Sequence, residues 1–214
     1  MRPRKRIAVL ISGRGSNLQA LIAAARDPGY PAAIALVIAN RPDAAGLAHA
    51  AAAGIHAIAL DHREYSAGSA HEVAIDAALQ RSGIEIVCLA GYMRVLTPWL
   101  VGRWSGRMLN IHPSLLPAFP GLDTHARALA AGVKLHGCTV HLVTEALDDG
   151  PILAQAAVPV LPGDTAETLA VRVLAQEHVI YPLAVALLAS GGRAASPDES
   201  ASLVNPLPGK IGRL

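Results

Sequence analysis

Two side chains suited to electrostatic and acid–base chemistry stand two residues apart in the sequence Asn-Ile-His-Pro that begins at residue 110. An amide is a permanent neutral hydrogen-bond donor, and an imidazole changes charge near neutral pH. Asn110 and His112 follow an apolar pair at 108–109, so on a strand both would point to the same face. Pro113 then ends the strand, because it has no N–H to donate. This pair suits a reaction in which negative charge develops on a carbonyl oxygen.

A carboxylate that could complete this group lies in Leu-Asp-Asp-Gly-Pro at 147–151. Placed near His112, the carboxylate of Asp148 would orient the imidazole and favour its charged form. The alternative is that Asp148 and Asp149 form a solvated hairpin turn, as such sequences often do.

Four histidines, at positions 112, 125, 136 and 141, invite a metal-site interpretation. Their spacings match no zinc pattern, and none lies in a His-Glu-x-x-His sequence, so we predict no metal site. His141 is expected to be a satisfied core or rim histidine. A serine nucleophile is also not expected, because the sequence has no Gly-x-Ser-x-Gly elbow.

A glycine-rich turn, Ser-Gly-Arg-Gly-Ser-Asn-Leu at 12–18, separates the first apolar run from the first helical pattern. Glycines permit close backbone approach, and a helix N-terminus attracts an anion. A P-loop is excluded, because the Gly-Lys-Ser/Thr ending is missing, and Leu18 replaces the third glycine of a dinucleotide fingerprint. The turn could cradle one phosphate on Gly15, Ser16 and Asn17, or Ser16 or Asn17 could simply cap the helix.

A second loop, Ala-Gly-Tyr-Met-Arg-Val-Leu at 90–96, follows the fourth apolar run. It combines backbone freedom, bulky apolar side chains and the guanidinium of Arg94, which would suit a slot for a flat, partly apolar ligand. The alternative is a loop that plugs the core with Met93 and Leu96 and leaves Arg94 solvated.

The elements needed to position these groups follow from apolar runs that alternate with helix-compatible Ala- and Leu-rich segments. Alternation of this kind predicts βαβ units and a parallel sheet. The last two strands are joined by one short loop and could pair antiparallel. We expect strands at 7–11, 34–39, 56–60, 84–90, 107–111, 137–143 and 152–158, and helices at 17–26, 43–53, 65–80 and 166–188. Asp164 or Thr165 would cap the last helix, and Pro182 would bend or divide it.

The composition favours a single α/β domain of 214 residues, with 52% hydrophobic and 3% aromatic residues. Net charge is +2, and we interpret the basic run Arg2, Arg4, Lys5 and Arg6 as a solvated tail, so nucleic acid is not an expected partner. No stretch looks like a membrane span of about 20 apolar residues. Cys88 and Cys138 lie in apolar runs and are predicted to be buried free thiols, consistent with a reducing cytoplasm.

Taken together and in this order, these segments resemble the folate-dependent formyltransferase family, and the glycine-rich turn points to its glycinamide ribonucleotide branch. The resemblance rests on residues 11–18, 90–94, 110–117 with 120–121, 136–141, 147–151 and 176–178. It implies a Rossmann-like formyltransferase fold: a mostly parallel central sheet flanked by helices, with an antiparallel C-terminal strand pair. Residues 1–190 would form the domain and 191–214 a C-terminal tail.

The resemblance implies transfer of the formyl group of 10-formyltetrahydrofolate, a cosubstrate, to the amine of 5-phosphoribosylglycinamide in de novo purine biosynthesis. It also implies roles, position by position. The catalytic residues would be Asn110, His112 and Asp148; Asp148 is preferred to Asp149 by its distance from Gly150-Pro151. The amine substrate would be held by Gly15, Ser16, Asn17 and Glu177, and the folate by Arg63, Met93, Arg94, Val95, Leu96 and Asn110.

Three alternatives stay open at this point. The chain could be another formyltransferase that uses 10-formyltetrahydrofolate, a formyltetrahydrofolate hydrolase, or a non-catalytic phosphometabolite-binding protein. A binding protein would not need Asn110, His112 and Asp148 together. We expect small-molecule partners, a cytoplasmic location, and a monomer or homodimer.

Overall fold

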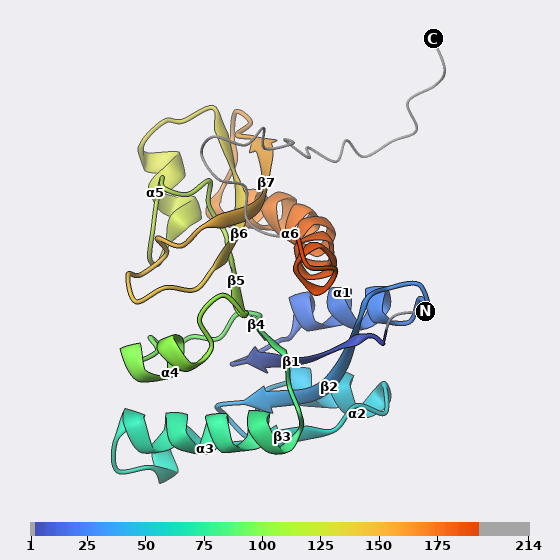
Figure 1. Cartoon of the computed structure of the whole chain (residues 1–214). Helices are drawn as coiled ribbons and strands as arrows, with labels where there is room; N and C mark the ends of the chain where they lie inside the picture. Colours follow the sequence, from blue (N-terminus) through green and yellow to red (C-terminus); the bar gives the residue numbers. More distant parts are fainter. Residues whose placement is uncertain (1–2, 193–214) are drawn as a thin grey trace.

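The computed structural model describes residues 3–192, in which seven strands form one sheet in the order β3-β2-β1-β4-β5-β6-β7 (Figure 1). Strands β1 to β5 pair in parallel, and β6 pairs antiparallel with both β5 and β7. The strands are β1 Lys5–Ile11, β2 Ala32–Ala39, β3 Ala57–Ala59, β4 Ile86–Leu89, β5 Met108–His112, β6 Leu135–Leu142 and β7 Ile152–Pro159. The predicted mostly parallel sheet with an antiparallel C-terminal pair is confirmed.

Helices cover both faces of the sheet, as parallel strands require. Apolar side chains of α1, α2, α5 and α6 pack on one face, and those of α3 and α4 pack on the other. The helices are α1 Ser16–Ala25, α2 Gly46–Ala52, α3 Gly68–Arg81, α4 Pro98–Arg103, α5 Thr124–Ala130 and α6 Ala166–Ala189, with a short 3-10 helix, η1 His62–Glu64. Helices α4 and α5 were not predicted from the sequence.

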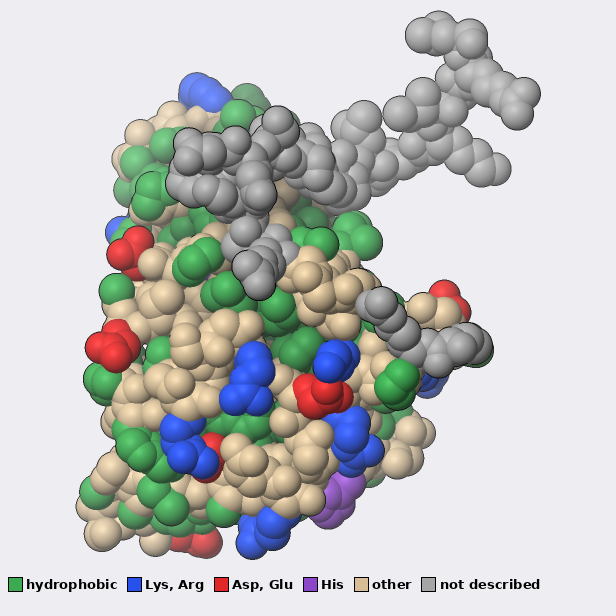
Figure 2. All heavy atoms as spheres, viewed as in Figure 1, with side chains coloured by type: hydrophobic (Ala, Val, Ile, Leu, Met, Phe, Trp, Pro, Cys, Tyr) green, Lys and Arg blue, Asp and Glu red, His purple; other side chains and the backbone are tan. Residues whose placement is uncertain are grey.

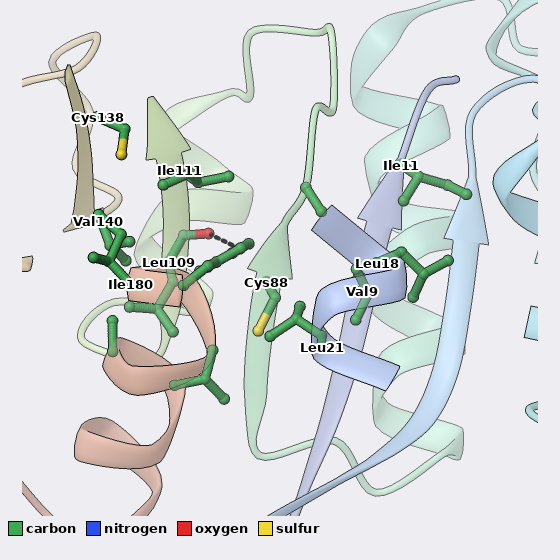
Figure 3. Packing of buried hydrophobic residues seen from close by; sticks show 14 of the residues in the cluster. Val9, Ile11, Leu18, Leu21, Cys88, Leu109, Ile111, Cys138, Val140 and Ile180 are labelled. Atoms are coloured by element: carbon green, nitrogen blue, oxygen red, sulfur yellow. Dashed lines mark hydrogen bonds between the residues drawn. The ribbon is translucent and has the colours of Figure 1, made fainter. Parts of the chain in front are cut away.

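Alternation along the strands divides the core in two. Ile7, Val9 and Ile11 of β1 face the α1/α6 side, and Ala8 and Leu10 face the α3/α4 side. In Figure 3, Leu18 and Leu21 of α1 lie beside Val9 and Cys88, while Ile180 of α6 lies near Val140 and Leu109. Cys88 and Cys138 are buried and free, as predicted.

The same alternation sets the direction of the polar pair on β5. Leu109 and Ile111 belong to the α1/α6 core, whereas Met108 belongs to the opposite core. Asn110 and His112 therefore share the face of Met108, and the strand ends at His112, immediately before Pro113. Both features were predicted from the sequence.

The basic run is not a tail from Lys5 onward, although Lys5 and Arg6 are solvent-exposed as expected. Strand β1 begins at Lys5, two residues earlier than expected, and residues 4–6 each have a specific partner. Arg4 donates to the carbonyls of Ala25 and Ala32, Lys5 pairs with Glu85 at 2.6 Å, and Arg6 donates to the carbonyl of Ser82 at 3.0 Å. Arg2 lies outside the described residues.

Helix α6 has one of its two predicted caps but differs from expectation in two other ways. Thr165 caps it by accepting from the Thr168 N–H, and the helix continues unbroken through Pro182, whose carbonyl accepts from the Tyr30 hydroxyl at 2.8 Å. By length and composition alone, α6 could cross a membrane, contrary to the expectation that no segment would qualify. Its apolar residues include Leu169, Val173 and Ile180, which are buried in the core, and a core helix passes the same test.

Charges on the drawn face of the molecule are mixed. In Figure 2, Lys and Arg side chains lie among acidic side chains and uncharged surface. Residues 193–214, which include most of the predicted tail, lie outside the described part of the chain, and the assignment of residues 1–190 to one domain stays a prediction.

The close pairing of β6 and β7 depends on a glycine. A Cβ at Gly137 would clash with the backbone oxygen of Ala156, so Gly137→Ala should destabilise the fold by about 1–3 kcal/mol through overpacking. The matched control is Gly102→Ala in α4, where an added Cβ meets no described atom within 4 Å, and which should be neutral or stabilising by about 0.5–1 kcal/mol. Urea unfolding of both variants measures the difference; equal effects would contradict the packing argument.

Candidate active site

A cavity of about 460 Å³ opens where β1, β2 and β4 end, at the carboxyl edge of the parallel strands. This edge is where α/β sheets bind ligands. Both predicted binding loops contribute to the cavity, although they are about 80 residues apart in the chain. It is lined by Ser12, Gly13, Arg14, Gly15, Ser16, Asn17, Asn40, Arg41, His62, Ala90, Gly91, Met93 and Arg94.

The first loop presents a free helix end to this cavity. Gly15 is the N-cap of α1 with φ of 76°, a left-handed conformation that glycine adopts without strain. Gln19 is the first residue whose N–H bonds back to Gly15, which leaves the N–H groups of Ser16 and Asn17 without intrahelical partners. The alternative role of these two side chains as helix caps is contradicted, because within residues 3–192 no side chain caps α1.

Close packing holds this helix end in place. A Cβ on Gly15 would lie 2.7 Å from the Cα of Gly46, at the start of α2, and the Gly46 N–H donates to the Gly13 carbonyl at 3.0 Å. The Ser12 hydroxyl accepts from the Met93 N–H at 2.8 Å, so the two loops that line the cavity are bonded to each other.

Asn17 and Glu177 meet beside the cavity, joining α1 to α6. The Asn17 amide donates to the Glu177 carboxylate at 2.6 Å, and both side chains are buried. Burial raises the pKa of Glu177, and the Asn17 bond partly offsets that rise. The other amide atom of Asn17, Oδ1, has no partner in the described structure, and neither does Oδ1 of buried Asn40. Both residues line the cavity, so they could accept hydrogen bonds from a ligand.

The second loop is more open than either interpretation assumed. Met93 is 65% exposed and Val95 78% exposed, so Met93 does not plug the core. Leu96 does pack, against the α3/α4 core, and Tyr92 is buried there. Exposed apolar side chains beside a cavity suit contact with an apolar ligand.

The predicted catalytic residues form a second cluster at the ends of β5 and β6. The His112 Nδ1 atom lies 3.4 Å from the Asp148 carboxylate, and its Nε2 atom lies 3.1 Å from the Phe119 carbonyl. Asn110 contacts His141, which lies 3.8 Å from Asp148. All members are buried or half-buried, and they come from β5, β6 and the turn after β6. Among the described residues, those lining the 460 Å³ cavity do not include Asn110, His112 or Asp148.

The backbone around Asp148 is arranged to aim its carboxylate inward. Asp148 has φ of 53°, a left-handed conformation that costs a non-glycine residue about 1–3 kcal/mol. Its side chain is 8% exposed and accepts from the Gly121 N–H at 2.8 Å, whereas Asp149 is exposed. A Cβ on Gly150 would clash with the Leu142 carbonyl, which fixes how closely the turn returns to β6. The solvated-turn alternative is therefore wrong for Asp148.

The remaining predicted residue, Arg63, points elsewhere in this structure. It forms a bidentate pair with Asp61, with the closest distance 2.6 Å, and it is absent from the described lining of the cavity. This pair lowers the pKa of Asp61 to about 2. Asn40, Arg41 and His62 line the cavity but were not predicted as site residues; their position directly after β2 and β3 is the signal that could have found them.

A family comparison agrees with the geometry. A model described as Formyl transferase matches residues 5–185, which is most of the chain. The chain belongs to the formyl transferase family.

Members of this family with known names are similar over most of the chain. Phosphoribosylglycinamide formyltransferase of Escherichia coli (strain K12) is 47% identical over 191 residues, covering 86% of this chain and 87% of that protein. The crystal structure of phosphoribosylglycinamide formyltransferase from Brucella melitensis has a TM-score of 0.84 and 57% identity, covering 90% of this chain and 100% of that one. Glycinamide ribonucleotide transformylase 1 from Symbiobacterium toebii has a TM-score of 0.87 and 50% identity, covering 89% of this chain and 90% of that one.

Longer formyl transferase relatives also match. The trifunctional purine biosynthetic protein adenosine-3 of Drosophila pseudoobscura pseudoobscura is 52% identical over 191 residues, or 88% of this chain. The chain spans only 14% of the length of that protein.

The buried Asn17–Glu177 bond predicts a pH-dependent stability defect. Asn17→Leu should cost about 1–3 kcal/mol at pH 7, because the Glu177 carboxylate loses a buried donor. The pKa of Glu177 is already raised, so the fold binds its proton more tightly than the unfolded chain does, and the defect should shrink as pH falls from 7 towards 5.

Urea unfolding at pH 7 and pH 5 measures this effect. The control is the double variant Asn17→Leu with Glu177→Leu, which removes both partners. In that variant this site should add almost no pH dependence to the free energy of unfolding. A defect of equal size at both pH values in Asn17→Leu alone would show that the carboxylate does not depend on this bond.

Proposed function

We propose that this protein is a phosphoribosylglycinamide formyltransferase, which transfers a formyl group from 10-formyltetrahydrofolate to the amine of 5-phosphoribosylglycinamide in purine biosynthesis. The observation that carries the proposal is the cluster of Asn110, His112 and Asp148, with 3.4 Å between the imidazole and the carboxylate. The names and coverage of the Escherichia coli and Brucella melitensis relatives support formyl transfer to the same amine acceptor.

The amine substrate carries a phosphate, and the free end of α1 suits it. The N–H groups of Ser16 and Asn17 point out of the helix N-terminus, where an anion is favoured, and Gly15 allows close approach. Glu177, held beside this end by Asn17, would accept hydrogen bonds from the ribose hydroxyls. The cavity lining contains three arginines and no carboxylate among the described residues, which also favours an anionic ligand.

The formyl donor would occupy the side of the second loop. Met93, Val95 and Leu96 offer apolar contact to a flat heterocycle, and Arg94 lines the cavity beside them. Arg63 would reach the acidic tail of the folate only by exchanging Asp61 for that carboxylate. When bound, 10-formyltetrahydrofolate supplies a formyl group that is already activated by its attachment to nitrogen.

The residues of the cluster then have distinct roles. Asn110 donates an amide N–H to the formyl oxygen as that oxygen gains negative charge. His112 donates a second hydrogen bond, for which its Nε2–H exchanges the Phe119 carbonyl for the formyl oxygen. Asp148 faces the His112 ring and moves a proton from the attacking nitrogen to the departing one. Asn110 also contacts the folate in this arrangement.

The activity is tested by mixing the protein with 10-formyltetrahydrofolate and 5-phosphoribosylglycinamide and following absorbance. Turnover that requires both compounds is expected. Release of tetrahydrofolate without the amine would identify a hydrolase, and no change in either mixture would favour a binding protein.

Asn110→Ala, His112→Ala and Asp148→Ala should each retain substrate binding and lose turnover. The loss of one oxyanion donor should lower kcat about 10²–10³-fold. Steady-state kinetics, with isothermal titration of 5-phosphoribosylglycinamide, separate the two effects. Near-normal kcat in all three variants would remove the catalytic assignment.

Ser16→Ala keeps the backbone N–H but removes the Ser16 hydroxyl, a further donor in the cavity lining. It should raise the KM for 5-phosphoribosylglycinamide more than it lowers kcat, because a phosphate far from the reacting atoms is bound equally in ground and transition states. The KM for the folate serves as the internal control and should not change. A kcat effect with unchanged KM would argue against a phosphate at this helix end.

Two further features belong to the proposal. The buried free thiols Cys88 and Cys138 are consistent with a cytoplasmic enzyme, since the cytoplasm keeps thiols reduced. Among residues 3–192, no group of three or more His, Cys, Asp or Glu side chains is placed to hold a metal ion. The choice between a monomer and a homodimer stays a prediction.

A further inference from the structure

His141 is a buried, hydrogen-bonded histidine, as expected from the sequence, but its contact with Asn110 was not predicted. It lies directly opposite Asn110 in the antiparallel pairing of β5 with β6, and its side chain is 2% exposed. The Asn110 Nδ2 atom is 3.2 Å from the His141 Nε2 atom. Cross-strand partners on one face of a sheet are close neighbours, so the strand register alone brings these two side chains together.

The other ring nitrogen determines which group donates in this contact. His141 Nδ1 lies 3.0 Å from the Leu142 carbonyl oxygen, which can only accept, so Nδ1 carries a proton. Burial lowers the pKa of His141, outweighing the Leu142 carbonyl and the Asp148 carboxylate, both of which raise it. The ring is therefore neutral at pH 7, and its Nε2 atom carries a lone pair that accepts from the Asn110 amide.

This arrangement selects one of two orientations of Asn110. Rotating the amide by 180° would exchange its NH₂ group and its oxygen, and that oxygen would then meet the lone pair of His141 Nε2. The observed contact excludes the rotated state, because two acceptors would face each other in a buried site. With one N–H bonded to His141, the second N–H of the same Nδ2 atom is left to donate elsewhere.

We propose that His141 is a positioning residue, which holds the Asn110 amide so that its second N–H faces the formyl oxygen. The proposal rests on the proposed function, since it assigns Asn110 the oxyanion role. Without His141, the amide could turn its oxygen towards the substrate, and an acceptor there would repel the developing charge. His141 itself touches neither substrate in this account.

A matched pair of substitutions separates this role from packing. The amide of His141→Gln reaches the region of Nε2 and can accept from Asn110, whereas the shorter His141→Asn reaches only the region of Nδ1 and the Leu142 carbonyl. His141→Asn should lower kcat about 10²-fold, as expected for losing one oriented oxyanion donor, with both KM values within about threefold of wild type. His141→Gln should stay within about tenfold of wild-type kcat. Equal losses in the two variants would overturn the proposal.

A double-mutant cycle tests whether the effect passes through Asn110. If His141 acts only by positioning that amide, adding His141→Asn to Asn110→Ala should lower kcat less than about threefold. A further loss of about 10²-fold in the double variant would show that His141 acts independently. Wild-type protein that does not turn over 5-phosphoribosylglycinamide would instead refute the proposed function, which distinguishes the two failures.

A measurement on the wild-type protein keeps the proposal testable if a variant does not fold. Nitrogen-15 NMR of labelled histidine at pH 7 should show His141 as neutral, with the proton on Nδ1. A charged ring, or a neutral ring with the proton on Nε2, would reverse the direction of the hydrogen bond to Asn110 and overturn the proposal.

Discussion

The rest of the site depends on the hydrogen-bond donors that stabilise the buried carboxylate of Asp148. A carboxylate that is 8% exposed needs donors around it, because an unpaired charge in a protein interior is strongly disfavoured. Two other segments meet that need for Asp148 and the turn that carries it: the Gly121 N–H from the loop after β5, and His112 from the end of β5. The loop at 119–121 is thereby attached to both partners, since the Phe119 carbonyl lies 3.1 Å from His112 Nε2. One buried charge thus organises three pieces of chain.

Two histidines beside this carboxylate have different hydrogen-bond partners. His112 faces an acceptor at each ring nitrogen, the Asp148 carboxylate and the Phe119 carbonyl. His141 faces one carbonyl acceptor and one amide donor, which a neutral ring satisfies. His141 lies farther from Asp148, at 3.8 Å against 3.4 Å. One carboxylate thus lies beside a histidine that faces two acceptors and a histidine that accepts from the Asn110 amide.

Local sequence patterns were sufficient to predict the strand that carries Asn110 and His112, the loops at 12–18 and 90–96, and the long helix α6. They failed for side chains whose bonding or packing partners are distant in the sequence. The basic residues at 4–6 were interpreted as a tail because their partners are remote in sequence. Those partners are Ala25, Ala32, Ser82 and Glu85. Pro182 was expected to bend or divide α6, because the local sequence does not show that neighbouring residues such as Ile180 and Tyr181 are buried in the core. Asp148 could be chosen over Asp149 by spacing, but only the left-handed backbone explains why its carboxylate points inward.

His141 shows most clearly what the local sequence pattern could not predict, which is its contact with Asn110. Taken alone, a histidine on a strand is more often a satisfied core residue than a functional one, and the sequence holds nothing to contradict that. The role proposed for it depends on the register of β6 against β5, which places His141 opposite Asn110 and Thr139 opposite His112. A shift of one residue would turn every β6 side chain to the other face. Glycines act on the other edge of β6: Gly137 lets it pair closely with β7, and Gly150 lets the turn that carries Asp148 return closely to the Leu142 carbonyl. A position without a side chain therefore helps to bring the Asp148 carboxylate within 3.8 Å of His141 on β6 and 3.4 Å of His112 on β5.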